Sequence, residues 1–204
     1  VTAYSGMDVL VHAMEALVAT EANHFTDALA EKAIELVIKN LPTCVERGTD
    51  EVARAAMHEA SCMAGLAFNQ AGLGITHALA HQLGGQFHVP HGLANAMLLP
   101  YVIMYNAANS NEAKLKYISI AQKLSLTTES DDESAQIAAL VRCAQSLARR
   151  VGCIITMKEF GIDEVSFKDS FPTLVQQAMV DRTYPGNPYA ATKEDLTRIL
   201  TCII

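Results

Sequence analysis

Four of the seven histidines in this chain lie within fifteen residues, in "HALAHQLGGQFHVPH": His77, His81, His88 and His91. His77 and His81 are four residues apart, so on a helix they share one face. Asp8 and His12 repeat that spacing in "GMDVLVHAMEA". Neutral imidazoles and carboxylates suit Zn²⁺ or Fe²⁺, and ligands from separate helices let the fold fix the geometry. Together these residues predict a divalent metal site.

The candidates outnumber the ligands that such a site needs. A catalytic site uses three or four protein ligands and keeps a position open for water or substrate. Spacing within a helix nominates His77 and His81 as joint ligands. Taken alone, Asp8 and His12 are more typical of an N-terminal capping residue and a surface histidine. The residues by themselves leave six candidates: Asp8, His12, His77, His81, His88 and His91.

The elements that must position these residues are predicted to be helices. Apolar residues recur three and four apart along nearly the whole chain, and the alternation typical of strands is absent. Thr26 and Thr49 are predicted N-caps, Pro90 is predicted at a helix start, and "GGQFHVP" is predicted to separate two helices. Segments 127–132 and 184–192 are predicted to be loops with the least order. The predicted helices cover about 6–21, 27–40, 50–70, 74–83, 91–107, 111–124, 132–150, 164–181 and 192–203.

Composition narrows the class of protein. The chain has 204 residues, half of them hydrophobic, which favours one domain over 1–204. A formal net charge of −7 and the lack of a basic run exclude a nucleic-acid partner. The apolar stretch "LANAMLLPYVIMY" is interrupted by Asn95 and Pro100 and is too short to cross a bilayer. The first residues lack the basic and apolar pattern of a secretory signal, so none is expected, and no segment reads as a strand with a Gly-rich turn that could bind a dinucleotide.

Cysteines and methionines are predicted to be packing residues. The cysteines are odd in number and form no C-x-x-C pair, so five buried thiols in a reducing cytosol are expected. Core packing is also expected for the methionines on apolar helical faces, and solvent exposure for the acidic run 129–133. The residues concerned are Cys44, Cys62, Cys143, Cys153, Cys202, Met57, Met63, Met97 and Met104.

Several long segments resemble a known family. "SGMDVLVHAMEA", "TDALAEKAIELV", "MHEASCMAGLAFNQAGLGITHALAHQLGGQFHVPHGLANAMLLPYVIMYN" and "YPGNPYAATKEDL" closely resemble, in that order, the C-terminal helical domain of the iron-dependent (group III) alcohol dehydrogenases. The stretch "HQLGGQFHVPHGLANA" is most similar to propanol and ethanol dehydrogenases of propanediol and ethanolamine utilisation and to the dehydrogenase half of aldehyde-alcohol dehydrogenases. The resemblance implies an all-α helical bundle of the dehydroquinate synthase-like fold. The family's N-terminal α/β nucleotide-binding domain has no counterpart in these residues, so a domain excised from a chain about twice as long is expected.

The resemblance also assigns roles to individual residues. It divides the "HALAH" pair, because His77 matches a metal ligand whereas His81 matches a residue that lines the active site beside the nicotinamide. Phe68 matches an aromatic residue that walls the substrate pocket, and His58 and His88 match no role. Tyr189 stands where an arginine is usual, which leaves the role of that loop open. The implied metal ligands are Asp8, His12, His77 and His91.

The activity implied is interconversion of small primary alcohols and aldehydes with NAD or NADP. The ion, Fe²⁺ with Zn²⁺ as the alternative, would act as a Lewis acid with a net charge near +1 at its site. His81 is a candidate proton relay, and its alternative role is packing against the cofactor. The resemblance further implies a homo-oligomer when full length, a cytoplasmic or bacterial-microcompartment location, and an inactive isolated domain.

A second hypothesis is a stand-alone helical metal-binding protein or a metal-dependent hydrolase. It predicts function without a nucleotide. The first hypothesis predicts instead an exposed apolar surface near residues 1–8 and 72–92, where the other domain would dock.

Overall fold

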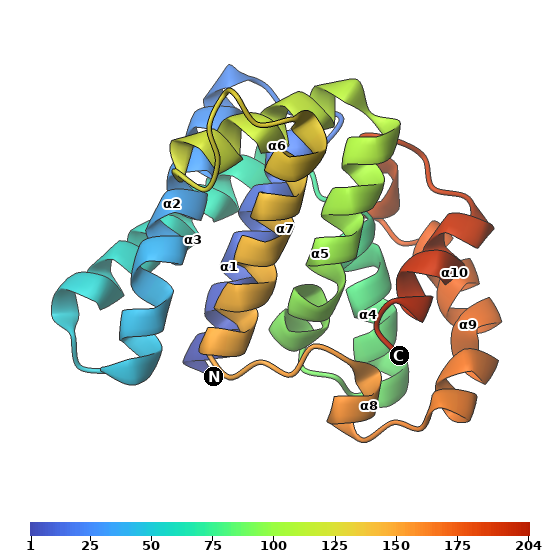
Figure 1. Ribbon diagram of the computed structural model, residues 1–204. Helices are drawn as coiled ribbons and strands as arrows, with labels where there is room; N and C mark the ends of the chain where they lie inside the picture. Colours follow the sequence, from blue (N-terminus) through green and yellow to red (C-terminus); the bar gives the residue numbers. More distant parts are fainter.

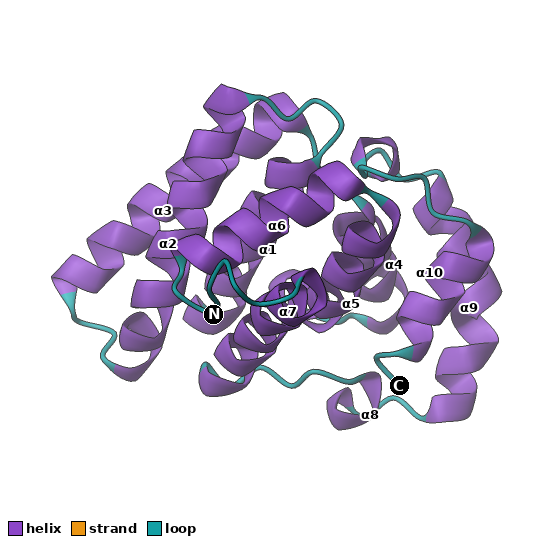
Figure 2. Ribbon diagram, turned by 45° about the horizontal axis from the view of Figure 1, so that its top comes forward, coloured by secondary structure: helices purple, strands orange, loops and turns teal.

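The computed structural model describes all 204 residues, and every regular element in it is helical (Figure 2). No strand is present, which confirms the predicted fold class. None of the helices has the length and apolar character that a membrane span requires. The elements are α1 (Thr2–Val18), α2 (His24–Glu46), α3 (Glu51–Ala71), α4 (Ile75–Phe87), α5 (His91–Asn109), α6 (Asn111–Lys123), α7 (Glu133–Arg150), α8 (Met157–Phe160), α9 (Glu164–Met179), the 3₁₀ turn η1 (Tyr184–Gly186) and α10 (Lys193–Thr201).

Helix α1 is the central element of the arrangement. It packs against α2 and α3 on one side and against α5 on the other, while α4 lies between α5 and α9 (Figure 1). Ten of its residues are buried, from Gly6 to Val18, as expected for a helix with neighbours on several sides. A polar side chain on the buried part of α1, such as Glu15, therefore faces other helices.

Two predicted N-caps are wrong. The cap of α2 is Asn23, whose side chain accepts hydrogen bonds from the N–H groups of Phe25 and Thr26. Thr26 lies at the third helical position, and its Oγ1 accepts a hydrogen bond from the backbone N–H of Asn23, which completes a capping box. Asp50, not Thr49, caps α3. In both cases a neighbouring Asn or Asp reaches the free N–H groups, and such side chains cap at least as well as threonine.

The predicted break at "GGQFHVP" begins too early. Helix α4 continues through both glycines to Phe87, because Leu83 is fully buried and Phe87 packs edge-on against Phe167. Such packing offsets the intrinsic cost of glycine in a helix, about 1 kcal/mol each. The helix ends at His88, which has a left-handed φ of 57° and donates its N–H to Gly84. His88 thus terminates the helix through its backbone.

The loop 184–192 is not a low-order segment. It contains the 3₁₀ turn η1, and its Asn187 is buried and bonded to Asn106 and to the N–H of Ile75. The acidic run 129–133 is exposed, as predicted. Short elements such as α8 and η1 were not predicted, because a single turn is too short to show a helical period.

The packing predictions hold for only some residues. All five thiols are free, but Cys62 and Cys202 are exposed and Cys143 is half-buried, so burial is confirmed only for Cys44 and Cys153. The methionines divide likewise: Met97 is buried, Met57 and Met63 pack partly buried against the core, and Met104 is exposed. Cys62, Cys143 and Met104 lie at outward-facing positions of their helices, and Cys202 lies just after the end of α10.

The apolar surface expected near residues 1–8 and 72–92 is not found there. Within those ranges Val1 is the only large apolar side chain that is exposed. The other exposed large apolar residues are Phe25, Val45, Val52, Leu66, Met104, Leu115, Val165, Val180 and Tyr189. They are distributed over several helices.

Candidate metal centre

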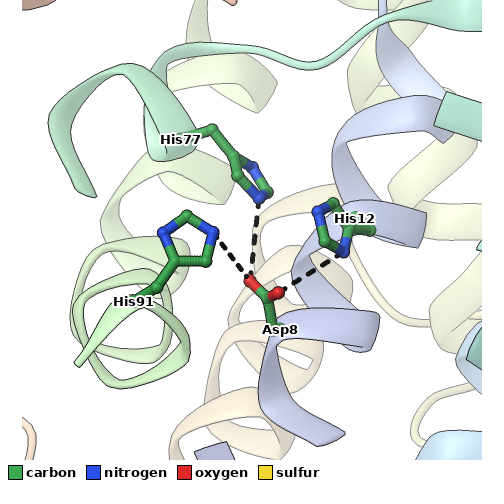
Figure 3. A group of neighbouring side chains, drawn as sticks. All are labelled: Asp8, His12, His77 and His91. Atoms are coloured by element: carbon green, nitrogen blue, oxygen red, sulfur yellow. Dashed lines mark ion pairs between the residues drawn. The ribbon is translucent and has the colours of Figure 1, made fainter. Parts of the chain in front are cut away.

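Three helices bring four side chains to one point. Asp8 and His12 come from α1, His77 from the first turn of α4, and His91 is the first residue of α5. Figure 3 shows the three imidazoles directed toward the Asp8 carboxylate. One potential ligand atom from each of the four residues lies within 4.8 Å of all the others. Residues separated by up to 83 positions thus form one cluster of three nitrogens and one carboxylate.

The spacing within this cluster suits a divalent cation. His91 Nε2 lies 3.3 Å from Asp8 Oδ1, His77 Nε2 lies 3.7 Å from the same oxygen, and His12 Nδ1 lies 3.7 Å from Oδ2. Two ligand atoms bound at about 2.1 Å to one tetrahedral ion are about 3.4 Å apart. The separation of His91 from Asp8 is close to that value, and the other two are slightly longer.

Close contact between two helices makes the cluster possible. A Cβ atom placed on Gly92 would lie 1.9 Å from the backbone oxygen of Tyr4 and 3.3 Å from Cβ of Asp8. No other residue fits there without movement of the backbone. Because Gly92 follows His91 directly, this contact between α5 and α1 places His91 beside Asp8.

Asn95 provides an independent test of the donor set. Its Nδ2 lies 2.6 Å from Asp8 Oδ1 and 3.2 Å from Nε2 of both His77 and His91. An amide NH₂ has two hydrogens, so it cannot satisfy these three atoms when each presents a lone pair. The Asn95 Oδ1 atom is buried and has no hydrogen-bond partner. Lone pairs in excess of donors at one point are what a cation site requires.

Glu15, one further turn along α1, extends the cluster into the core. Its Oε2 accepts hydrogen bonds from His77 Nδ1 at 2.7 Å and from the N–H of Gly74 at 3.0 Å, and its Oε1 accepts from the N–H of Thr76 at 2.7 Å. The Glu15 side chain is 3% exposed and that of His77 is 2% exposed. Three donors therefore surround a carboxylate that is almost fully buried.

The pKa shifts follow from this environment. Burial raises the pKa of Glu15, but the bonds from His77, Thr76 and Gly74 outweigh it, so its net pKa lies below the ordinary value. Burial opposes the charged form of His77, yet the facing carboxylates of Asp8 and Glu15 raise its pKa to about 9. Burial lowers the pKa of His12 to about 4 and also lowers the pKa of His91. His12 and His91 are thus neutral near pH 7, the state in which imidazole binds a metal.

His81 lies outside the four-residue cluster. Its Nδ1 bonds to Asp181 Oδ2 at 2.8 Å, and Asp181 also accepts from the N–H and the hydroxyl of Thr183. The His81 ring stacks on His91 with centroids 5.4 Å apart. Of the pair that helical spacing nominated as joint ligands, only His77 belongs to the cluster.

Other predicted residues border the cluster. Phe68 of α3 stacks on His12, with ring centroids 4.5 Å apart. A cleft of about 390 Å³ opens beside Asp8 and His12, and His58 is part of its wall. His88 has no side-chain contact with the cluster; its role is the helix end described above.

Sequence reasoning missed Glu15, Asn95 and Asp181. A signal for Glu15 was present, because an acid inside the apolar run "HAMEALV" falls one turn after His12 on the same helix. Burial of such a residue requires partners. No comparable signal marked Asp181, whose partner His81 is 100 residues away.

Comparisons with known proteins identify the family of this chain. Residues 2–204 match the model of the Fe-containing alcohol dehydrogenase family, C-terminal. The chain is 46% identical over 202 residues to 1-propanol dehydrogenase PduQ of Salmonella typhimurium, covering 98% of this chain and 54% of that protein. It is 40% identical over 202 residues to NADPH-dependent butanol dehydrogenase of Clostridium saccharobutylicum, covering 99% and 50%. The chain therefore spans about half the length of these curated relatives.

Solved structures show the same fold. A 1,3-propanediol oxidoreductase superposes with a TM-score of 0.92 at 34% identity, covering 99% of this chain and 51% of that one. A sulfoacetaldehyde reductase of Bifidobacterium kashiwanohense, solved in complex with NAD⁺, superposes with a TM-score of 0.84 at 27% identity, covering 100% and 50%. Both likenesses extend over essentially the whole of this chain.

Proposed function

This chain belongs to the Fe-containing alcohol dehydrogenase family, and from that premise we propose that its 204 residues form the metal-binding half of an NAD(P)-dependent enzyme that interconverts small primary alcohols and aldehydes. The observation that carries the proposal is the cluster of Asp8, His12, His77 and His91. The relatives named for propanol and butanol support a small aliphatic substrate.

We assign the metal to the four clustered side chains. Fe²⁺ is our choice because of the family, and Zn²⁺ is the alternative, since both accept three nitrogens and one oxygen. When bound, such an ion supplies Lewis acidity, which eases loss of the alcohol proton and polarises an aldehyde carbonyl. Glu15 changes the expected charge of the site, because with Asp8 it places two negative charges against a divalent ion.

The chain's own residues supply orientation and proton transfer. Phe68 stacks on His12 and provides an apolar wall beside the cluster. Asp181 holds Nδ1 of His81, so Nε2 is the nitrogen left to take up or release a proton. His81 is one-third exposed, which gives it access to solvent. This contact favours the relay role over simple packing against the cofactor.

The nucleotide-binding residues belong, in this proposal, to the half of the relatives' length that this chain does not match. Nicotinamide as the cofactor is supported by the NAD⁺ complex of one structural neighbour and by the NADPH-dependent relative. We expect the 204-residue polypeptide to bind metal yet to turn over little. Robust NADH-dependent aldehyde reduction by this polypeptide alone would contradict that division of labour.

Metal analysis tests the proposal directly. Protein purified without oxygen is expected to carry about one Fe²⁺ per chain, measured by elemental analysis. The variant His12→Ala serves as the matched control, because it removes one nitrogen of the cluster. Zn²⁺ as the only ion, with activity of the complete enzyme lost on exchange for Fe²⁺, would reverse the choice of metal. A chain that binds no divalent ion would refute the site.

A further inference from the structure

The four clustered side chains do not explain how His77 presents the correct nitrogen to an ion. An imidazole can carry its proton on either ring nitrogen, and only the nitrogen without a proton binds metal. In this structure Nε2 of His77 faces Asp8, whereas Nδ1 faces Glu15. The group opposite Nδ1 therefore decides whether the lone pair at Nε2 is available.

We propose that Glu15 is a positioning residue of the metal centre, which holds the proton of His77 on Nδ1 and so directs the lone pair of Nε2 toward the ion. The inference rests on the proposed function and concerns the same site. An ionised carboxylate can only accept hydrogen bonds, so Nδ1 at 2.7 Å must be the donor. Glu15 does not belong to the four-residue cluster, and its only side-chain hydrogen bond to a member of the cluster is with His77.

The carboxylate is itself held by the start of α4. Gly74 and Thr76 donate backbone N–H groups to its two oxygens, and His77 follows directly in the same turn. Free N–H groups at a helix N-terminus favour an anion. A Cβ on Gly74 would lie 3.0 Å from Oε1 of Glu15, so the backbone approaches the carboxylate closely there. One buried acid thus fixes both the position of the helix turn and the ring orientation of the ligand on it.

The chain contains a matched pair for the test. His81 has the same kind of contact, Nδ1 to the carboxylate of Asp181 at 2.8 Å, but it lies outside the cluster. Glu15→Gln and Asp181→Asn make the same chemical change at the two contacts. In Glu15→Gln at least one donor must face the NH₂ group whichever way the amide turns, because all three surrounding groups donate.

The measurement is the affinity for Zn²⁺, by competition with a chromogenic chelator, on variants whose fold is checked by circular dichroism. Glu15→Gln is expected to bind Zn²⁺ about 10- to 100-fold more weakly than wild type. Asp181→Asn is expected to bind Zn²⁺ within about twofold of wild type, because the contact between Asp181 and His81 is partly exposed to solvent. Wild-type affinity in folded Glu15→Gln would overturn the inference and leave the proposed function intact. Failure of the wild type to bind Zn²⁺ would instead overturn the proposed function.

A second measurement uses the wild-type protein and so does not depend on whether a variant folds. In wild-type protein loaded with Zn²⁺, ¹⁵N NMR of the histidine rings is expected to show a proton on Nδ1 of His77 that exchanges slowly with solvent. In the affinity measurement, the conservative variant Glu15→Asp, which keeps the charge, is expected to retain more affinity for Zn²⁺ than Glu15→Gln. A proton on Nε2 of His77 in the loaded protein would overturn the inference.

Discussion

The two histidines of "HALAH" have the same kind of partner in very different surroundings. Each bonds through Nδ1 to a carboxylate, His77 to Glu15 at 2.7 Å and His81 to Asp181 at 2.8 Å. The side chains of the first pair are 2% and 3% exposed, whereas those of the second are 32% and 13% exposed. One turn of α4 thus separates a pair locked in the core from a pair in contact with solvent.

This difference supports the two roles proposed for the histidines of this motif. Burial removes the competition of water, so the Glu15–His77 contact is stronger and its loss leaves a buried charge without a partner. The Asp181–His81 contact is partly screened, and its histidine can exchange protons with solvent. Burial of the first pair fits the ligand role proposed for His77, and exposure of the second pair fits the relay role proposed for His81.

The largest expected effect is on stability. Glu15→Ala is expected to lower the free energy of unfolding by about 3–5 kcal/mol, because it leaves His77 and two N–H groups buried without an acceptor. Asp181→Ala is expected to cost about 1 kcal/mol or less. Urea denaturation of the metal-free proteins measures both values. Equal losses of unfolding free energy in the two variants would contradict the distinction between the two pairs.

Metal affinity should separate the histidines themselves. His77→Ala is expected to weaken Zn²⁺ binding by about 100-fold or more, because loss of a direct ligand exceeds the loss of an outer partner. His81→Ala is expected to change it by about twofold at most. Titration against a chelator of known affinity provides the comparison. A large loss in His81→Ala would return that residue to the list of ligands.

The buried pair should also determine how stability depends on pH in the metal-free protein. The raised pKa of His77 means that its charged form is stabilised by folding, fully below the ordinary value of 6.5. This contribution is lost as the pH rises through about 9, so the free energy of unfolding should fall between 6.5 and 9. Saturating Zn²⁺ should flatten the slope, because the ion replaces the proton at Nε2. Stability that rises over this window would contradict the assignment.

The smallest effect is expected at the solvent-exposed pair of His81 and Asp181. In the complete enzyme, His81→Ala is expected to lower kcat by about 100-fold, within the usual range for general acid-base groups, and to change its pH profile. Asp181→Asn should lower kcat less, about tenfold, because the histidine remains in place. Steady-state kinetics over a range of pH tests both. Unchanged turnover and pH dependence in His81→Ala would exclude the relay.

Much of the fold was predictable because helical periodicity is local. Apolar spacing predicted the nine longer helices, and the errors lay at their ends, as at Asn23 and Asp50, where a neighbouring side chain reached the free N–H groups first. The course of α4 through Gly84 and Gly85 was missed, because the packing of Phe87 on Phe167 joins residues 80 positions apart. Local patterns carry no information about such contacts.

The sequence by itself determined the all-helical class, the family, and a set of residues that can bind a divalent ion. The types and order of these residues are given by the sequence, and the resemblance to the family depends on nothing else. Only the tertiary structure decided how the two histidines of one motif differ. Glu15 is 62 residues from His77 and Asp181 is 100 residues from His81, so neither partner nor burial follows from spacing along α4. Hydrogen bonding and exclusion of water arise where distant segments meet, and those contacts give the two imidazoles their different partners and exposure.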